Sequence, residues 1–449
     1  MQASNSPEDI AIVGGGIVGL ILAAGLFRRS INVTVYERAR GFREIGAGIA
    51  FTANAIRCMQ LIDPSIVAAL RSSGAIPTST DPKDPNDYLR WVNGFVQDDS
   101  GDGACQRPLC KIDAGVRGFE GCRRDQFLEE LAKLVPKDKI VFRKHLIDLV
   151  QPNDPEERLK LVFEDGTIAH ADAVFGCDGV KSYVRKFVLG CDSPASSAHY
   201  SHQFAFRGLI PMTQAITALG DYEARNQFMH VGPGMHLIHY PVANHTMVNV
   251  AAFVHDAEDW VNDGQMVAPA TREEVRFVFR NWVPPLRHLV SLLPEKLDKW
   301  ALFDTWEWPA PQYNAGKVCL VGDAAHASTP HHGAGACMGV EDVLCLTTLL
   351  EAVMQSVGTE RVGKGHALTL AFDVFNRIRR PRTQWLVDSS RRVCDLYHQR
   401  EWGDLKRWTK AEVCFEEIRD RTFKIWHFDY ESMLRETRAA FEQGLDLLS

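Results

Sequence analysis

The chain has 449 residues, of which 45% are hydrophobic and 24% charged, and its formal net charge is −7 at pH 7. This composition is ordinary for a folded globular protein and excludes a disordered or low-complexity chain. The negative net charge argues against a general nucleic-acid binder, which must neutralise phosphates, and the length predicts two or three domains.

Residues 10–27 carry no charge and are long enough, by length alone, to span a bilayer. Glu8 and Asp9 precede them without a basic leader, which does not fit a signal peptide. We therefore expect no membrane segment and a cytoplasmic protein. The eleven scattered cysteines contain no CxxC pair, so we interpret them as mostly reduced thiols and expect no metal site.

The first predicted elements form a β-α-β unit. Residues 10–13 are a short apolar run typical of a buried parallel strand, and residues 21–29 are compatible with a helix. Residues 31–37 are rich in β-branched side chains, which favours a second strand. This order predicts a Rossmann-like, doubly wound α/β domain at the N-terminus.

The turn of this unit carries Gly14-x-Gly16-x-x-Gly19. Gly14 permits a tight turn, Gly16 lets the backbone approach a pyrophosphate, and Gly19 lets the helix pack close to the sheet. Glu37, 23 residues after Gly14, ends the second strand and can accept both hydroxyls of an adenosine ribose. A glycine triplet alone also fits a structural turn, but in this context it predicts dinucleotide binding.

Later segments indicate a second domain. Residues 76–111 are dense in Pro, Asp, Gly and Ser, which predicts long loops around a strand at 88–95. Residues 122–135 predict an amphipathic helix. Three β-like runs within 191–300 predict a separate, mostly antiparallel sheet.

The predicted fold is therefore α/β, with a nucleotide-binding domain interleaved with a substrate domain. The nucleotide-binding domain would comprise residues 8–75, 112–190 and 301–370, and the substrate domain residues 76–111 and 191–300. A helical C-terminal region would follow at 371–449. This tail has no catalytic signature, and its aromatic residues suggest a subunit contact, as in a homodimer.

Two further motifs each follow a predicted buried strand. One is GCDGVKSYVR with Asp178, which also fits a strand followed by an Asp-Gly turn. The other is GDAAH with Asp323, continuing through GAGACMGVED, and it also fits a turn capped by aspartate. The order of GGGIVG with Glu37, GCDGVKSYVR and GDAAH…P…GAG…ED resembles the class A flavoprotein monooxygenases of the para-hydroxybenzoate and salicylate hydroxylase type.

This resemblance covers about residues 8–400. It implies one FAD, NADH or NADPH as reductant, and O₂, with an electrophilic flavin C4a-hydroperoxide as the oxidant. It assigns the ADP half of FAD to Gly14, Gly16, Gly19 and Glu37. The chain departs from the pattern at Arg123, where the family often has histidine, and we expect little effect from that change.

The same resemblance implies further cofactor contacts. Arg124 corresponds to the family arginine near the flavin phosphates, and Asp178 to a motif shared by FAD and the nicotinamide. Asp323 would hold a ribityl hydroxyl. Ala50 and Ala336 would lie close to the flavin through their backbones.

A closer similarity is carried by EIGAGIAFTANAIRCM, FAFRGLI, HLIHYPVAN, TPHHGAGACMGVED, RRVCDLY and IWHFDY. These segments are similar to fungal monooxygenases that dearomatise polyketide aryl aldehydes on routes to azaphilones and tropolones. In that group Arg207 and Tyr240 correspond to the substrate-binding and catalytic pair. The implied partner is a small phenolic molecule, which Arg207 can hold as a phenolate while Tyr240 donates a second hydrogen bond.

Other interpretations remain open from the residues alone. Arg207 could equally be a salt-bridged residue of a strand, and Tyr240 an ordinary half-buried aromatic. Structural or pocket-lining roles are expected for His239, His331 and His332. Decarboxylative hydroxylation of salicylate needs the same flavin chemistry, and a non-catalytic FAD protein would keep the same motifs. The sequence Trp306-Glu307-Trp308-Pro309 only partly matches a flavin halogenase signature, so we expect packing aromatics on a strand there.

Overall fold

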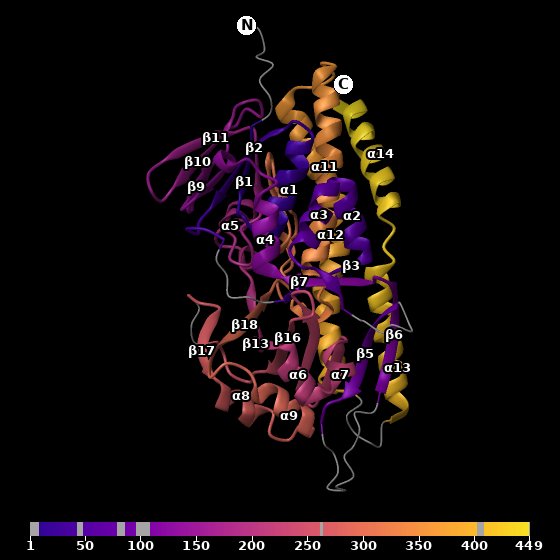
Figure 1. Cartoon of the computed structure of the whole chain (residues 1–449). Coiled ribbons are helices and arrows are strands. Elements are labelled where there is room, and N and C mark those ends of the chain that lie inside the picture. Colours follow the sequence, from indigo (N-terminus) through magenta and orange to yellow (C-terminus); the bar gives the residue numbers. More distant parts are fainter. Residues whose placement is uncertain are drawn as a thin grey trace.

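The computed structural model describes residues 9–42, 48–78, 86–95, 108–260, 264–401 and 408–448. Most of the loops predicted within 76–111, and the predicted start of the first domain at residue 8, lie outside the described residues. Figure 1 shows one sheet region in the upper half of the molecule and another in the lower half, with long C-terminal helices beside both.

The upper sheet has six strands in the order β19-β20-β12-β1-β2-β8, parallel except for the β19–β20 pair. Its strands are β1 Asp9–Val13, β2 Asn32–Glu37, β8 Ile140–Phe142, β12 Ala173–Gly176, β19 Asn314–Ala315 and β20 Val318–Leu320. The uncharged segment 10–27 divides into β1 and helix α1, Ile17–Arg28. Among the described residues, no helix is both long and apolar enough to cross a membrane.

Helices and a small sheet cover this six-stranded sheet. The helices are α1, α2 Ala53–Ile62, α3 Pro64–Ser72, α4 Arg124–Ala132, α5 Tyr183–Leu189, α10 Asp323–His326 and α11 Gly335–Gly358. The small antiparallel sheet consists of β9 Leu146–Val150, β10 Leu159–Phe163 and β11 Ile168–Ala171. A Cβ on Gly339 of α11 would lie 2.4 Å from Val18 of α1, so this glycine lets the two helices pack closely.

The lower sheet has eight strands in the order β17-β18-β13-β16-β15-β14-β5-β6, antiparallel except for the β14–β5 pair. The strands are β5 Asn86–Asn93, β6 Pro108–Val116, β13 His199–Pro211, β14 Phe228–Gly232, β15 Met235–Val242, β16 Met247–His255, β17 Val267–Thr271 and β18 Lys296–Asp304. The predicted fold class, with a mostly antiparallel second sheet, is therefore confirmed. The predicted boundaries at 112 and 301 fall inside β6 and β18.

The two faces of the eight-stranded sheet differ because side chains alternate along each strand. One face packs its core residues, such as Phe206, Leu237 and Val250, against residues of α6, α8 and α9. The helices on this side are α6 Met212–Leu219, α7 Asp221–Ala224, α8 Arg272–Val278 and α9 Pro284–Ser291. The opposite face of the sheet borders a cavity.

Two further groups of elements connect the sheets. A three-stranded sheet joins β3 Gly48–Thr52, β7 Phe119–Arg123 and β4 Ile76–Pro77. The C-terminal helices are α12 Lys364–Tyr397, α13 Trp408–Trp426 and α14 Tyr430–Leu448. Helix α14 packs on α11 and α12, whereas α13 lies beside β6 at the lower right of Figure 1.

Candidate active site

A cavity of about 730 Å³ lies over the free face of the eight-stranded sheet. Its walls come from both halves of the molecule: the sheet below, strand β3 and residues 328–336 above, and helix α13 at one side. A volume of this order is typical of a small-molecule site. The position also explains why residues from distant parts of the sequence meet here.

Strand register brings the floor residues together. Met229, Ile238, Ala251 and Arg207 are cross-strand neighbours on β14, β15, β16 and β13, so their side chains share one face. Tyr240 follows Ile238 by two positions and therefore projects from the same face. All five residues line the cavity.

The local environment suits Arg207 and Tyr240 to different kinds of hydrogen bonding. Burial lowers the pKa of Arg207, Tyr240 opposes this shift, and the nearby Arg124 guanidinium lowers the pKa further. Burial raises the pKa of Tyr240, so its hydroxyl stays protonated at neutral pH and can donate. The Arg207 guanidinium carbon lies 5.6 Å from the centre of the Trp300 ring, a cation–π contact that restrains its direction.

Strand β3 lies directly over this pair. Ala50 of β3 pairs with Gly121 of β7, where a Cβ would lie 3.4 Å from the Tyr240 ring. The side-chain oxygen of Asn249 on β16 accepts a hydrogen bond of 2.8 Å from the Gly48 amide. These two contacts hold the Ala50 strand against the substrate-side sheet.

Arg124 and Asp323 form a charged corner of the same cavity. Burial lowers the pKa of Arg124, while Asp323 and Asp125 oppose that shift. Burial raises the pKa of Asp323, and His326 and Arg124 act against it. Asp323 lies deep in the protein, yet its side chain is accessible from the cavity together with Ala336, so both can reach a bound group.

The glycine motif has the geometry of a phosphate-binding turn. Gly14 has φ +106°, and a Cβ there would lie 2.3 Å from the Cys177 carbonyl oxygen, while a Cβ on Gly19 would lie 2.1 Å from the Gly14 oxygen. A Cβ on Gly16, by contrast, would meet nothing within 4 Å. The open side of Gly16 therefore lies at the N-terminus of α1, where an anion can approach the backbone.

Glu37 lies beside this turn at the end of β2. Its two carboxylate oxygens accept hydrogen bonds of 2.7 Å from the amides of Gly15 and Ala39. These bonds fix the carboxylate at the edge where an adenosine ribose would lie. The turn, Glu37 and the Arg124–Asp323 corner thus offer groups that would suit the pyrophosphate, ribose and ribityl parts of an FAD.

Asp178 is held as a turn residue. Its side chain accepts hydrogen bonds of 2.7 and 3.1 Å from the amides of Tyr183 and Val184 in the first turn of α5. Burial raises the pKa of Asp178, and these bonds and one from Ser182 oppose the shift. The nearby Val180, rather than Asp178, lines the cavity.

The structure therefore divides the predicted site residues into two groups. The residues lining the cavity are Ala50, Arg124, Arg207, Tyr240, Asp323 and Ala336. Those at the edge of the six-stranded sheet, outside that lining, are Gly14, Gly16, Gly19, Glu37 and Asp178. Within the second group, the backbone at Gly14 packs closely against Cys177 and Asp178.

The histidines considered from the sequence occupy different places. His331 and His332 line the cavity, with Nε2 atoms 2.6 Å from the Gln203 side-chain oxygen and 2.9 Å from the Ser389 hydroxyl. His239 instead stacks on His230, at 5.0 Å between ring centres. His239 follows Ile238 directly, and strand alternation places it on the helix-covered face.

Sequence reasoning missed several residues that line the cavity. They are His236, Asn249, Trp300, Thr422 and Trp426. His236 could have been found, because it precedes Tyr240 by four positions on the same strand face. Thr422 and Trp426 belong to the C-terminal tail, whose position over the cavity has no local sequence signal.

The expectation for Trp306 and Trp308 was wrong. Strand β18 ends at Asp304, and both indoles lie about half exposed on the bend that follows. Trp306 donates through Nε1 to Asp388 at 3.3 Å and lies beside the Arg391 guanidinium. These tryptophans are therefore surface residues rather than packing residues of a strand.

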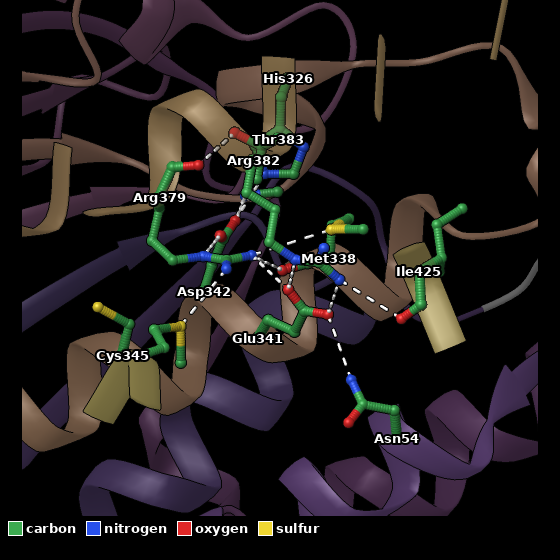
Figure 2. Close-up of polar contacts among 12 residues, drawn as sticks. Asn54, His326, Met338, Glu341, Asp342, Cys345, Arg379, Arg382, Thr383 and Ile425 are labelled. Carbon is green, nitrogen blue, oxygen red and sulfur yellow. Dashed lines mark hydrogen bonds and ion pairs between the residues drawn. The ribbon is translucent and has the colours of Figure 1, made fainter. Parts of the chain in front are cut away.

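Figure 2 shows a buried ion network around Glu341 and Asp342 of α11. Arg379 of α12 binds Glu341 at 2.9 Å and Asp342 at 2.8 Å, and Arg382 binds Glu341 through two nitrogens at 2.7 and 2.8 Å. Asp342 also lies 2.6 Å from His326 Nε2 and accepts a 3.2 Å bond from the Gly322 amide. The network thus fixes the turn that carries Asp323.

Comparison with known proteins agrees with this geometry. Residues 127–390 match the family model described as an FAD binding domain. The chain is 54% identical to "Salicylate hydroxylase asL1" of Sarocladium schorii, over 97% of this chain and 91% of that protein. It is 53% identical to "FAD-dependent monooxygenase eupB" of a Phoma species, over 97% of this chain and 98% of that protein.

Among solved structures, a salicylate hydroxylase substrate complex is similar at a TM-score of 0.79 and 26% identity, covering 97% of this chain and 98% of that one. Fold, cofactor motifs and relatives therefore agree. The chain belongs to the FAD-dependent monooxygenases that carry this FAD binding domain. It is accordingly a flavoprotein oxidoreductase, as the sequence predicted.

Proposed function

We propose that this enzyme hydroxylates an electron-rich phenolic ring, using FAD, NADH or NADPH, and O₂. The single observation that carries the proposal is the position of Arg207 and Tyr240 in the same cavity as Ala50 and Asp323. The favoured substrate is a polyketide-derived aryl aldehyde of fungal secondary metabolism, which the reaction would dearomatise. Similarity to fungal FAD-dependent monooxygenases supports this choice.

The residues that we expect to hold FAD are those that the family resemblance assigns, and their geometry supports these roles. Gly16 and the N-terminus of α1 would receive the pyrophosphate, Glu37 the adenosine ribose, and Asp323 a ribityl hydroxyl. Ala50 and Ala336 would face the ring system, and Asp178 would support the turn near the nicotinamide. FAD, reduced by NAD(P)H and exposed to O₂, supplies an electrophilic oxygen.

Arg207 and Tyr240 prepare the ring for attack. A phenolate is far more nucleophilic than a phenol, and the Arg207 cation lowers a bound phenol's pKa by direct pairing. The Tyr240 hydroxyl donates a second hydrogen bond, which fixes the angle of the ring. Placement matters because a small misalignment of reacting atoms costs a large factor in rate.

The product depends on what the attacked carbon carries. If this carbon bears a methyl group, it holds no proton that could leave after oxygen is added. The ring then stays dearomatised, as a hydroxylated dienone. If it bears a carboxylate, loss of CO₂ restores the aromatic ring.

The second case defines a second candidate function, decarboxylative hydroxylation of salicylate. It is favoured by the similarity to a protein named as a salicylate hydroxylase and to a salicylate hydroxylase substrate complex. In this case Arg207 would pair with a carboxylate or phenolate of the same substrate. The two candidates share the cofactor and differ only in the group on the attacked carbon.

One experiment separates the two candidates. The purified yellow protein is incubated with NADPH, O₂ and a 2,4-dihydroxy-3-methyl-6-alkylbenzaldehyde, and in parallel with salicylate, and products are analysed by mass spectrometry. A gain of one oxygen with loss of aromatic absorption supports dearomatisation. Catechol from salicylate, with the aldehyde unchanged, would reject it in favour of the decarboxylating reaction.

A further inference from the structure

The cavity floor changes from charged to apolar across the sheet. The cross-strand row starts at Arg207 on β13, continues through Ala251 and Ile238, and ends at Met229 on β14. Neighbouring strands are about 4.8 Å apart, so the ends of this row are separated by about 14 Å. A phenol held at Arg207 with its substituent along this row would need a chain of several carbon atoms to reach Met229.

Helix α13 closes the apolar end of this row. Trp426, the last residue of α13, lines the cavity and packs against the buried cluster that contains Leu89 and Met229. Its ring lies edge-on to Phe119 of β7, at 5.0 Å between centres. Thr422, one turn earlier on α13, lines the same wall.

Trp426 also touches the cofactor side of the cavity. It packs against a second buried cluster, which contains Ala334 and Met338 at the start of α11. Trp426 thus lies between the start of α11 and the apolar end of the floor. Helix α13 lies outside residues 127–390, which match the FAD binding domain model.

We propose that Trp426 is a specificity-determining residue that sets the length of the apolar substituent accepted on the phenolic ring. The proposal rests on the proposed function, because it assumes a phenol anchored at Arg207 and Tyr240. The substrate class is a phenol with an unbranched alkyl or alkenyl chain, whose far end contacts Trp426, Leu89 and Met229. Replacing the indole by a small side chain lengthens the cavity at this end and removes the contact that a chain of matching length makes.

The test measures kcat/KM for 2,4-dihydroxy-3-methylbenzaldehydes carrying methyl, propyl, pentyl or heptyl at position 6. For each enzyme we divide kcat/KM for the heptyl compound by kcat/KM for the methyl compound. We expect Trp426→Ala to raise this ratio at least tenfold. The change should appear mainly in KM, because the indole contacts the substituent and not the reacting ring. Trp426→Phe, which keeps an aromatic wall, should give an intermediate ratio and serves if the alanine variant does not fold.

Trp306→Ala is the matched control, because Trp306 is half exposed on the bend after β18 and does not line the cavity. An unchanged chain-length ratio in folded Trp426→Phe or Trp426→Ala, with normal FAD content, would overturn the proposal. A shift of the same size in Trp306→Ala would overturn it as well. Failure of the proposed function is distinct, because the wild-type enzyme would then oxidise none of the four aldehydes.

Discussion

The cavity and the buried ion network both hold arginine side chains deep in the protein, but these side chains are satisfied differently. In the network, Arg379 and Asp342 are fully buried and bound to each other at 2.8 Å. In the cavity, no described residue forms a hydrogen bond with the Arg207 guanidinium or the Tyr240 hydroxyl, although both groups lie deep in the protein. Polar groups that are satisfied internally stabilise a fold, whereas groups left to face a cavity are available for a ligand.

The largest effect is expected from the network. Arg379→Met leaves the buried Asp342 carboxylate without its arginine and removes one of the two arginines bound to Glu341, and we expect a loss of about 3–5 kcal/mol in unfolding free energy. Chemical denaturation measures this loss. Arg361→Met, which breaks exposed ion pairs to Glu442 and Asp446, should cost less than about 1 kcal/mol. Equal losses for the two variants would remove the distinction between the regions.

The next largest effect concerns the cavity. Arg207→Ala should lower kcat/KM for the phenolic substrate by about 10²–10³-fold, because the phenolate loses its cation. FAD content and the unfolding midpoint should stay near wild type, since Arg207 makes no hydrogen bond to a described residue. Product formation and flavin absorbance are measured on the same sample. Full turnover by Arg207→Ala would contradict the assigned role.

A smaller effect is expected for Tyr240→Phe. This variant keeps the ring that packs over Gly121 and removes only the hydroxyl, so one hydrogen bond to the substrate is lost. We expect kcat/KM to fall about tenfold, with a larger share of NADPH oxidised without product as the ring loses its fixed angle. Comparing NADPH consumption with product yield measures both. Wild-type values for both would show that the hydroxyl does not touch the substrate.

The smallest effect concerns pH. Burial lowers the pKa of His332 to about 3, with Arg421 acting in the same direction, so the folded protein keeps this ring neutral. The unfolded chain binds a proton near pH 6.5, so the stability from neutral His332 is present above that pH and is lost progressively below it. Between pH 6.5 and 5.5 the unfolding free energy of His332→Gln should therefore fall by about 1 kcal/mol less than that of the wild type.

Denaturation curves at these two pH values test the prediction. His170→Gln, at an exposed position of β11, is the control and should leave the pH dependence unchanged. An unchanged pH dependence in His332→Gln would show that this ring is protonated in the folded protein.

Much of the cofactor site could be predicted because its signals are local. The Gly14–Gly19 turn and Glu37 lie within one β-α-β unit, so their spacing alone places them around one strand edge. Asp323 and Ala336 likewise follow directly from the end of β20 and the start of α11. Parallel strands carry such turns at their carboxyl ends, which is why a short motif is informative.

The substrate side could not be predicted in the same way. Arg207 and Tyr240 were identified through resemblance, because the face on which a strand residue projects depends on register with strands far along the chain. Tyr240 faces the cavity, whereas His239, one position earlier, faces the helices. A shift of one residue in strand register would therefore exchange the two side chains. Asn249 meets Gly48 across 201 residues, and no local pattern marks that contact.

The amino-acid sequence was enough to predict the fold class and the turn proposed to bind FAD, since these depend on local spacing and residue type, and family resemblance supplied the kind of chemistry. Only the tertiary structure decided which polar groups face the cavity and which are bound inside the protein. It also decided that the C-terminal tail forms a cavity wall through Trp426, although the tail carries no catalytic motif. The physical reason is that packing of distant elements, rather than propensity, determines what surrounds a side chain.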